Sequence, residues 1–212
     1  MRVLGFPTAE AAAEAAGDAI GVLLRGAIQA RGCATLAASG GRTPGPAWEA
    51  LVRVPLDWAR ITVFQVDERV VGEDDPARNL RGLRRIFGAV PVALRPMPLD
   101  GSTYDLPPEL DVVQLGMGGD GHTASLFPAP DPGAPDWPAG DFGQVGPHLG
   151  HTRWTLGFAP IRRARARVFL ITGADKAPAL RRVLAGDTSL PAASVGGATV
   201  FADQAALGVL AG

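Results

Sequence analysis

Hydrophobic residues recur along the chain with two different spacings, which predict helices alternating with buried strands. After Thr8, the expected N-cap, apolar residues return every three or four positions as far as Ile28, and Gly32 then ends the predicted helix. Further helices are predicted from Pro44 through Leu51, over 79–87, over 177–185 and over 203–207. Short apolar runs predict strands over 33–38, 61–66, 111–115, 153–158, 168–172 and 199–201. This alternation is typical of a single α/β domain, residues 1–212, with a mainly parallel sheet.

Segments rich in proline and glycine separate some of these elements. Residues 89–108 are predicted to be irregular, apart from a short strand near 94–97. Residues 129–150 are predicted to form a long surface loop without regular structure, beside the functional site. His148 and His151 lie near the end of this loop, and we expect both side chains to be exposed to solvent.

The most informative stretch is 111–128, in which a predicted strand ends in a glycine-rich loop. Four glycines between positions 116 and 121 break the strand and permit backbone conformations that other residues rarely adopt. The loop brings Asp120 and His122 to the carboxyl end of the strand, which is the edge where open α/β sheets bind ligands. Residues 123–126 are predicted to begin a helix whose free N–H groups face the same edge. We favour a functional site over a solvated turn, because the chain has three histidines and this one follows a buried strand.

A second polar turn follows the predicted strand 33–38. Its residues are Ser39, Gly40, Gly41, Arg42 and Thr43. Pro44 then suits the first turn of a helix. Unpaired N–H groups and the positive end of the helix dipole favour phosphate at such a turn. The spacing is not that of a Walker loop, and an ordinary strand-to-helix turn is the alternative.

Charged residues lie at the ends of other predicted strands. Asp67, Glu68 and Arg69 directly follow one strand, and Arg153 lies at the start of another. Lys176, the only lysine, precedes a predicted helix. A cation is unfavourable at a helix N-terminus but is more tolerable there when it binds an anion. Two or three such cations beside a polar turn would be enough to bind a sugar phosphate.

Composition narrows the functional classes. A single cysteine, Cys33, excludes an internal disulfide and suits a reducing compartment. The 20 basic residues balance the 21 acidic ones, so nucleic acid is not an expected partner. No apolar run approaches the roughly 20 residues of a membrane span, and the N-terminus does not have the features of a secretory signal. We therefore expect a cytoplasmic protein that does not bind membranes, and a monomer, with an oligomer left open.

Several kinds of catalytic site have no support in the sequence. No GxGxxG motif follows the first predicted strand, so dinucleotide binding is not expected. No serine occupies a GxSxG motif, which disfavours covalent catalysis. Three scattered histidines and one cysteine do not make a zinc site. We expect neither a metal nor an organic cofactor.

Four segments, in order, resemble the 6-phosphogluconolactonase family. DVVQLGMGGDGHTASLFP over 111–128 is similar to the family signature. The other three are LAASGGRTP over 36–44, FQVDERVV over 64–71, and RWTLGF over 153–158 followed by ITGADKA over 171–177. The resemblance implies one Rossmann-like, three-layer α/β domain, similar to the folds of glucosamine-6-phosphate deaminases and ribose-5-phosphate isomerases. It also implies hydrolysis of 6-phospho-D-glucono-1,5-lactone to 6-phospho-D-gluconate in the oxidative pentose phosphate pathway, with this small sugar-phosphate lactone as the partner.

Lactone hydrolysis needs an activated water, donors for the oxyanion and a proton for the leaving ring oxygen. His122 is the expected general base, because imidazole titrates close to neutral pH. Asp120, and Asp67 as a second candidate, would fix its tautomer or hold the water. Backbone N–H groups of the 116–121 loop, which includes Gly118 and Gly119, are expected to meet the developing oxyanion.

The resemblance also implies which residues bind the substrate. By motif position, the phosphate contacts of the family correspond to the turn 39–43, to Arg153 and to Lys176. Arg69 corresponds to an arginine that the family directs toward the substrate. The chain departs from the family at Ala129, where glycine is frequent, and over 78–82 and 129–150. These departures affect the expected loop contacts more than the chemistry.

Two other functions are weighed against the lactonase. A glucosamine-6-phosphate deaminase is the nearest alternative. The resemblance to that family implies the motif DGHxxFNEP, with a glutamate that serves the catalytic histidine, and this chain has no glutamate between Ser125 and Pro128. A non-catalytic sugar-phosphate sensor is the second alternative. It would carry a DNA-binding helical module, for which residues 1–32 offer one helix and no room. An assay with the lactone and with glucosamine 6-phosphate separates these functions.

Overall fold

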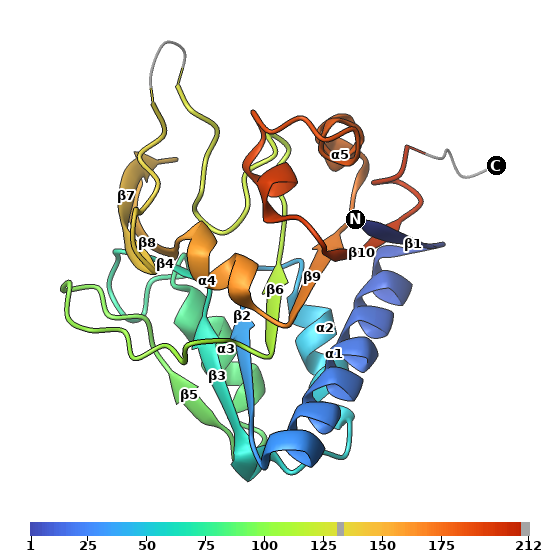
Figure 1. Ribbon diagram of the computed structural model, residues 1–212, viewed down its shortest axis with the longest axis vertical. Helices are drawn as coiled ribbons and strands as arrows, with labels where there is room; N and C mark the ends of the chain where they lie inside the picture. Colours follow the sequence, from blue (N-terminus) through green and yellow to red (C-terminus); the bar gives the residue numbers. More distant parts are fainter. Residues whose placement is uncertain (131–133, 209–212) are drawn as a thin grey trace.

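The computed structural model describes residues 1–130 and 134–208. Among them, seven strands form one sheet in the order β1-β10-β9-β6-β2-β3-β5, and every neighbouring pair is parallel (Figure 1). The strands are β1 (Arg2–Phe6), β2 (Ala34–Ala38), β3 (Ile61–Gln65), β5 (Ala93–Arg95), β6 (Val112–Leu115), β9 (Ala166–Ile171) and β10 (Thr199–Asp203). The predicted parallel α/β sheet is therefore confirmed, whereas the single domain over 1–212 stays a prediction.

Side chains alternate between the two faces of the sheet, so that each face carries its own core. In β2, Leu36 and Ala38 belong to one core and Ala37 to the other. The first core is covered by α1 (Ala9–Arg31), α2 (Gly45–Arg53), η1 (Trp58–Arg60) and α3 (Asn79–Phe87). The second is covered by α4 (Phe158–Arg163), α5 (Ala177–Leu184), η3 (Pro191–Val195) and a smaller sheet. This arrangement confirms the predicted three layers.

The ends of α1 follow the prediction. The side-chain oxygen of Thr8 accepts a hydrogen bond from the backbone N–H of Ala11 at 3.1 Å. Gly32 has a φ of 79°, and its N–H donates to the carbonyl of Ile28 at 2.8 Å. Within residues 1–130 and 134–208, no helix combines the length and the hydropathy that crossing a membrane requires.

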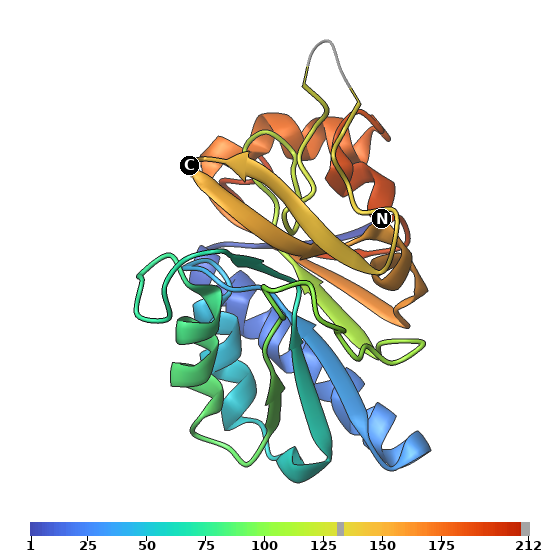
Figure 2. The ribbon, with the colours of Figure 1, turned by 90° about the vertical axis from the view of Figure 1, so that its left-hand side faces the viewer.

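The smaller sheet is antiparallel and was not expected. It contains β4 (Asp67–Arg69), β7 (Phe142–His148) and β8 (His151–Leu156) in the order β4-β8-β7. In Figure 2 the hairpin of β7 and β8 lies apart from α2 and α3, over the other face of the large sheet. Residues 67–69, which the sequence places directly after a strand, form a short strand of their own that pairs with β8.

The hairpin of β7 and β8 also corrects the prediction that residues 129–150 have no regular structure. Leu149 and Gly150 join the strands with φ values of 50° and 79°, and two successive positive values are typical of a type I′ turn. Gly146 and Pro147 lie where the pairing of β7 with β8 shifts its register. A bulged edge strand tolerates both residue types, which is why the sequence pattern hid it.

Several smaller predictions also change. His148 and His151 are half-buried rather than exposed. Asp203 ends β10, and residues 204–208 form turns instead of the helix predicted over 203–207. The short strand predicted near 94–97 is β5. The sequence does not predict β1 or α4, which are short elements at the edge of the sheet and above it. Residues 131–133 of the predicted loop lie outside the described residues.

The order of the strands fixes where a ligand can bind. β2 and β6 are neighbours in the middle of the sheet. After β2 the chain enters α2 on one face, and after β6 it continues to the smaller sheet and α4 on the other face. Two loops that diverge in this way leave a crevice at the carboxyl ends of the strands, which is the usual ligand site of open α/β sheets.

Candidate active site

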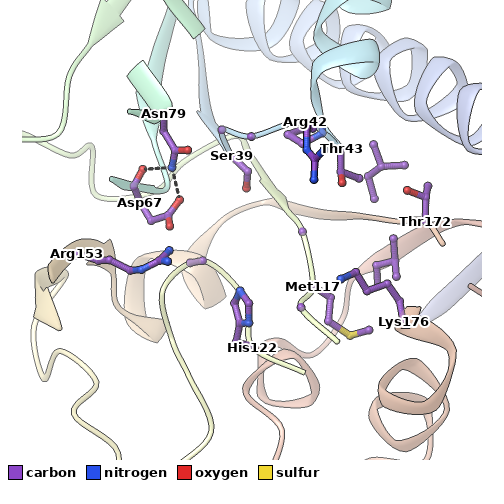
Figure 3. Close-up of a pocket in the computed structure, with 18 of the residues that line it drawn as sticks. Ser39, Arg42, Thr43, Asp67, Asn79, Met117, His122, Arg153, Thr172 and Lys176 are labelled. Atoms are coloured by element: carbon purple, nitrogen blue, oxygen red, sulfur yellow. Dashed lines mark hydrogen bonds between the residues drawn. The ribbon is translucent and has the colours of Figure 1, made fainter. Parts of the chain in front are cut away.

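A cavity of about 240 Å³ lies at the carboxyl ends of β2, β6 and β9 (Figure 3). Most residues that the sequence predicts for the site line it, namely Ser39, Gly40, Gly41, Arg42, Thr43, Asp67, Arg69, Gly118, His122, Arg153 and Lys176. Two predicted residues, Gly119 and Asp120, do not line the cavity. Asp120 nevertheless reaches it through its contact with His122.

The loop after β6 holds His122 against Asp120. The Oδ1 atom of Asp120 lies 2.6 Å from Nδ1 of His122 and accepts the backbone N–H of His122 at 3.1 Å. A carboxylate at this distance favours the tautomer in which Nδ1 carries the proton, so that Nε2 keeps its lone pair. The imidazole is 25% exposed and lines the cavity, and Nε2 is therefore the nitrogen available to a ligand or a water.

His122 keeps the carboxyl group of Asp120 ionised. Partial burial by itself raises the pKa of this carboxyl group, but the hydrogen bond and the positive charge of His122 lower it to about 2. Asp120 therefore stays negative throughout the pH range in which an imidazole gains or loses its proton.

Glycine at position 118 is what allows the two side chains to pair. A Cβ there would lie 2.1 Å from Nδ1 of His122 and 2.5 Å from Oδ1 of Asp120. The N–H of Gly118 donates to the carbonyl of His122 at 2.9 Å, and the N–H of Gly121 donates to the carbonyl of Gly118 at 3.0 Å. These two N–H groups are engaged within the loop, so the expectation that the loop offers them to an oxyanion is wrong for both.

Residues 123–126 form a tight turn rather than the predicted start of a helix. Thr123 and Leu126 exchange backbone hydrogen bonds of 3.3 and 2.9 Å. Between them, Ala124 has a φ of 52°, a left-handed conformation that residues with a Cβ rarely adopt, and it lines the cavity. The turn directs the hydroxyl of Ser125 toward Asp67.

Both carboxylate oxygens of Asp67 accept hydrogen bonds from buried side chains. Ser125 Oγ donates to Oδ2 at 2.6 Å, and Asn79 Nδ2 donates to Oδ1 at 3.0 Å. Ser125 and Asn79 are buried, as is Asp67 itself. Because both oxygens are occupied, the geometry favours Asp67 as a fixed negative charge over Asp67 as the base.

Asn79 is a site residue that the sequence analysis did not single out. Its backbone N–H donates to Oε1 of Glu68 at 2.7 Å, and the N–H of Leu80 donates to Oε2 at 2.8 Å. The fully buried Glu68 thus serves the free N–H groups at the start of α3. The Asn79 side chain also lies against Gly40. A Cβ at position 40 would lie 2.4 Å from Cγ of Asn79, so this position requires glycine.

Two arginines, Arg69 and Arg153, line the cavity and bring positive charge to it. Arg69 donates to the carbonyl of Ala77 at 2.8 Å, and Arg153 donates to the carbonyl of His148 at 3.4 Å. The Nε atoms of both arginines are buried and have no hydrogen-bond partner within the described part of the chain. Burial, and then the positive charge of Arg69, lowers the pKa of the Arg153 guanidinium, which Asp67 partly offsets. The site therefore concentrates positive charge that an anion would stabilise.

The turn after β2 is anchored at its first residue. Ser39 Oγ donates to the carbonyl of Gln114 at 2.9 Å, and the indole N–H of Trp48 donates to the carbonyl of Ser39 at 3.0 Å. These bonds tie the turn to β6 on one side and to α2 on the other. The turn then leads into the N-terminus of α2, where Pro44 provides no side-chain cap.

Lys176 lies across the cavity from Arg153. It ends η2 (Ala174–Lys176) and precedes α5, and its Nζ lies 2.8 Å from Oδ2 of Asp175. Figure 3 shows Lys176, Thr43 and Thr172 on one side of the cavity, Asp67 and Arg153 on the other, and His122 between them. The two ends of the cavity thus offer separate cationic groups with an imidazole between them.

The sequence analysis did not name the other lining residues as site residues. They are Pro44, Asn79, Gly116, Met117, Ala124, Leu170, Ile171 and Thr172. Thr172 directly follows β9, and its place at a strand end is the one feature that could have indicated it. No group of three or more His, Cys, Asp or Glu side chains that could hold a metal occurs in residues 1–130 and 134–208.

Comparison with known proteins gives the family. Residues 7–202 match the family described as glucosamine-6-phosphate isomerases/6-phosphogluconolactonase. A 6-phosphogluconolactonase of Synechocystis sp. is 40% identical over 183 residues, which cover 75% of each chain. A 6-phosphogluconolactonase of Rhizobium meliloti is 37% identical over 194 residues, covering 81% of this chain and 82% of that one.

Solved structures agree with this match. A 6-phosphogluconolactonase from Shewanella baltica superposes with a TM-score of 0.83 at 27% identity, covering 96% of this chain and 97% of the other. A monomeric glucosamine-6-phosphate deaminase gives a TM-score of 0.80 at 20% identity over 99% of this chain and 100% of the other, which shows a shared fold alone. The chain belongs to the glucosamine-6-phosphate isomerase/6-phosphogluconolactonase family.

Proposed function

We propose that the protein hydrolyses 6-phospho-D-glucono-1,5-lactone to 6-phospho-D-gluconate, a step of the oxidative pentose phosphate pathway. The observation that carries the proposal is the imidazole of His122, paired with Asp120 and lying between two cationic ends of one cavity. The relatives from Synechocystis sp. and Rhizobium meliloti, both 6-phosphogluconolactonases, support the same reaction.

In the proposed reaction, His122 acts as the general base. Its Nε2 takes a proton from a water as the water oxygen attacks the lactone carbonyl carbon. Asp120 keeps the proton on Nδ1 and stabilises the imidazolium that forms. When the tetrahedral intermediate collapses, the imidazolium gives its proton to the departing ring oxygen, and the products are one carboxylic acid and one hydroxyl group on the same chain.

The negative charge that develops on the carbonyl oxygen needs donors. The loop N–H groups of Gly118 and Gly121 are engaged, whereas the positively charged side chains of Arg69 and Arg153 line the cavity. We therefore infer that the arginines serve the oxyanion or the carboxylate product more readily than the loop backbone does. Asp67, whose two oxygens both accept hydrogen bonds, supplies a negative charge that partly compensates the positive charge of Arg153.

The phosphate of the substrate is assigned to the turn 39–43 and Lys176. The turn combines flexible glycines with a helix N-terminus, and Lys176 supplies a positive charge across the cavity. The family resemblance assigns Arg153 to the phosphate as well, whereas its place across the cavity from Lys176 favours the lactone end of the substrate. A phosphate bound near Lys176 would place the ring of a six-carbon lactone beside His122.

The proposed activity is tested by adding purified protein to the freshly prepared lactone. Because the lactone hydrolyses spontaneously, the protein should accelerate acid release clearly above the rate without protein. Glucosamine 6-phosphate, the substrate expected of the deaminase alternative, should not be turned over. A well-folded protein that leaves the lactone at its spontaneous rate would contradict the proposal.

Replacement of the base is the second test. His122→Asn keeps the size of the side chain but cannot accept the proton, and kcat should fall by about 10²- to 10⁴-fold with little change in KM.

His151→Asn is the matched control for this variant. His151 is half-buried on β8 and does not line the cavity, so its replacement should leave kcat unchanged. If His122→Asn is folded and as active as His151→Asn, His122 is not the base.

The phosphate assignment predicts a substrate-dependent effect at Lys176. Lys176→Ala removes one charge-assisted hydrogen bond, worth about 1.5–3 kcal/mol, so KM for the phosphorylated lactone should rise about 10- to 100-fold. Unphosphorylated gluconolactone serves as the control, because its KM should change little. Equal losses with both substrates would show that Lys176 supports the fold or the chemistry instead.

A further inference from the structure

The phenyl ring of Phe127 contacts three polar side chains of the site. Its centroid lies 4.5 Å from that of the His122 imidazole, with 33° between the planes, and 3.8 Å from that of His148, with 21° between the planes. The Cζ atom of Arg153 lies 5.4 Å from the same centroid. Phe127 is buried and does not line the cavity, so it contacts these side chains from within the protein.

The backbone of Phe127 is held on both sides. The tight turn 123–126 precedes it, and Pro128 follows it, which restricts its conformation to extended values. The indole N–H of Trp137 donates to the carbonyl of Phe127 at 2.6 Å. The ring is therefore a fixed surface, although sequence analysis treats it only as part of a motif.

The two cavity residues on this surface have few other restraints. For His122, the bond from Nδ1 to Asp120 fixes one point of the ring but leaves its plane free to tilt. For Arg153, the 3.4 Å hydrogen bond to the carbonyl of His148 is long, and Nε has no partner in the part of the chain that the structure describes. An aromatic face supplies what is missing, since it attracts a guanidinium and packs against an imidazole without binding its nitrogens.

We propose that Phe127 is a positioning residue, which fixes the plane of the His122 imidazole and the place of the Arg153 guanidinium relative to each other. This inference rests on the proposed function, because it concerns the geometry of that reaction. A phenyl ring offers no hydrogen-bonding group, so it orients the imidazole and leaves Nε2 to the water. Through His148, the same ring ties the hairpin of β7 and β8 to the site.

The kinetic test compares variants that keep or remove the flat ring. Phe127→Leu retains an apolar side chain but not the aromatic face, and kcat should fall about 10- to 100-fold, as expected when a catalytic group is displaced by about 1 Å. Phe127→Tyr keeps the ring and should retain most of the wild-type kcat. Phe6→Leu is the control, because Phe6 also stacks on another ring, that of Phe201, at the far edge of the sheet.

A spectroscopic test does not depend on turnover. The chain has three histidines, and two of them, His122 and His148, lie against Phe127. Their imidazole C–H proton resonances, assigned with His122→Asn, should be displaced by the ring current of Phe127 and should move in Phe127→Leu. The His151 resonances should stay in place in Phe127→Leu, and the resonances of all three histidines should stay in place in Phe6→Leu.

These measurements separate the two hypotheses. An absent lactonase rate in the wild type would contradict the proposed function, while the proton resonances still decide whether the ring of Phe127 lies against His122. The positioning role is overturned if Phe127→Leu leaves the His122 resonances unchanged, or if it lowers kcat no more than Phe6→Leu does.

If Phe127→Leu does not fold, His148→Ala replaces it, because it removes the half-buried ring stacked on Phe127. That variant should move the His122 resonances and lower kcat more than Phe6→Leu does. Unchanged resonances together with an unchanged kcat would overturn the proposal.

Discussion

The pairing of β2 with β6 in the middle of the sheet is the constraint on which the site depends. Leu36 lies opposite Val112 and Ala37 opposite Val113, so the two strands end side by side. The chain then leaves them toward opposite faces of the sheet, and the cavity lies where the two loops diverge. The smaller sheet and the residues after β9 complete the walls of this crevice.

Within the crevice, polar side chains can approach closely because two neighbouring positions are glycine. Gly118 leaves room for the contact of Asp120 with His122, and Gly40 leaves room for Asn79. Each of these contacts then fixes a charge: Asp120 stays negative beside the imidazole, and Asn79 holds Asp67 beside the arginines. One carboxylate thus lies beside the imidazole of His122 and the other beside the guanidinium of Arg153.

The sequence predicts the central strands and the residues of the loop after β6, because both are local patterns. A strand buried on two faces is a continuous apolar run, and Asp120 and His122 are two residues apart. The roles of Asn79 and Ser125 were not predictable in this way. Their hydrogen bonds to Asp67 join residues 12 and 58 positions apart, and no periodicity reports such contacts. β7 was missed because Gly146 and Pro147 lie at a bulge, where they weaken the strand pattern without ending the strand.

The central claim is that His122 faces the lactone carbonyl while the phosphate lies at the opposite end of the cavity. A crystal structure with 6-phospho-D-gluconate bound tests it most directly, because the product carries both groups. We expect the phosphate against Lys176 and the turn 39–43, and the C1 carboxylate within about 3 Å of Nε2 of His122 or one water away. A product bound in the reverse direction, or with its carboxylate out of reach of His122, would contradict the account.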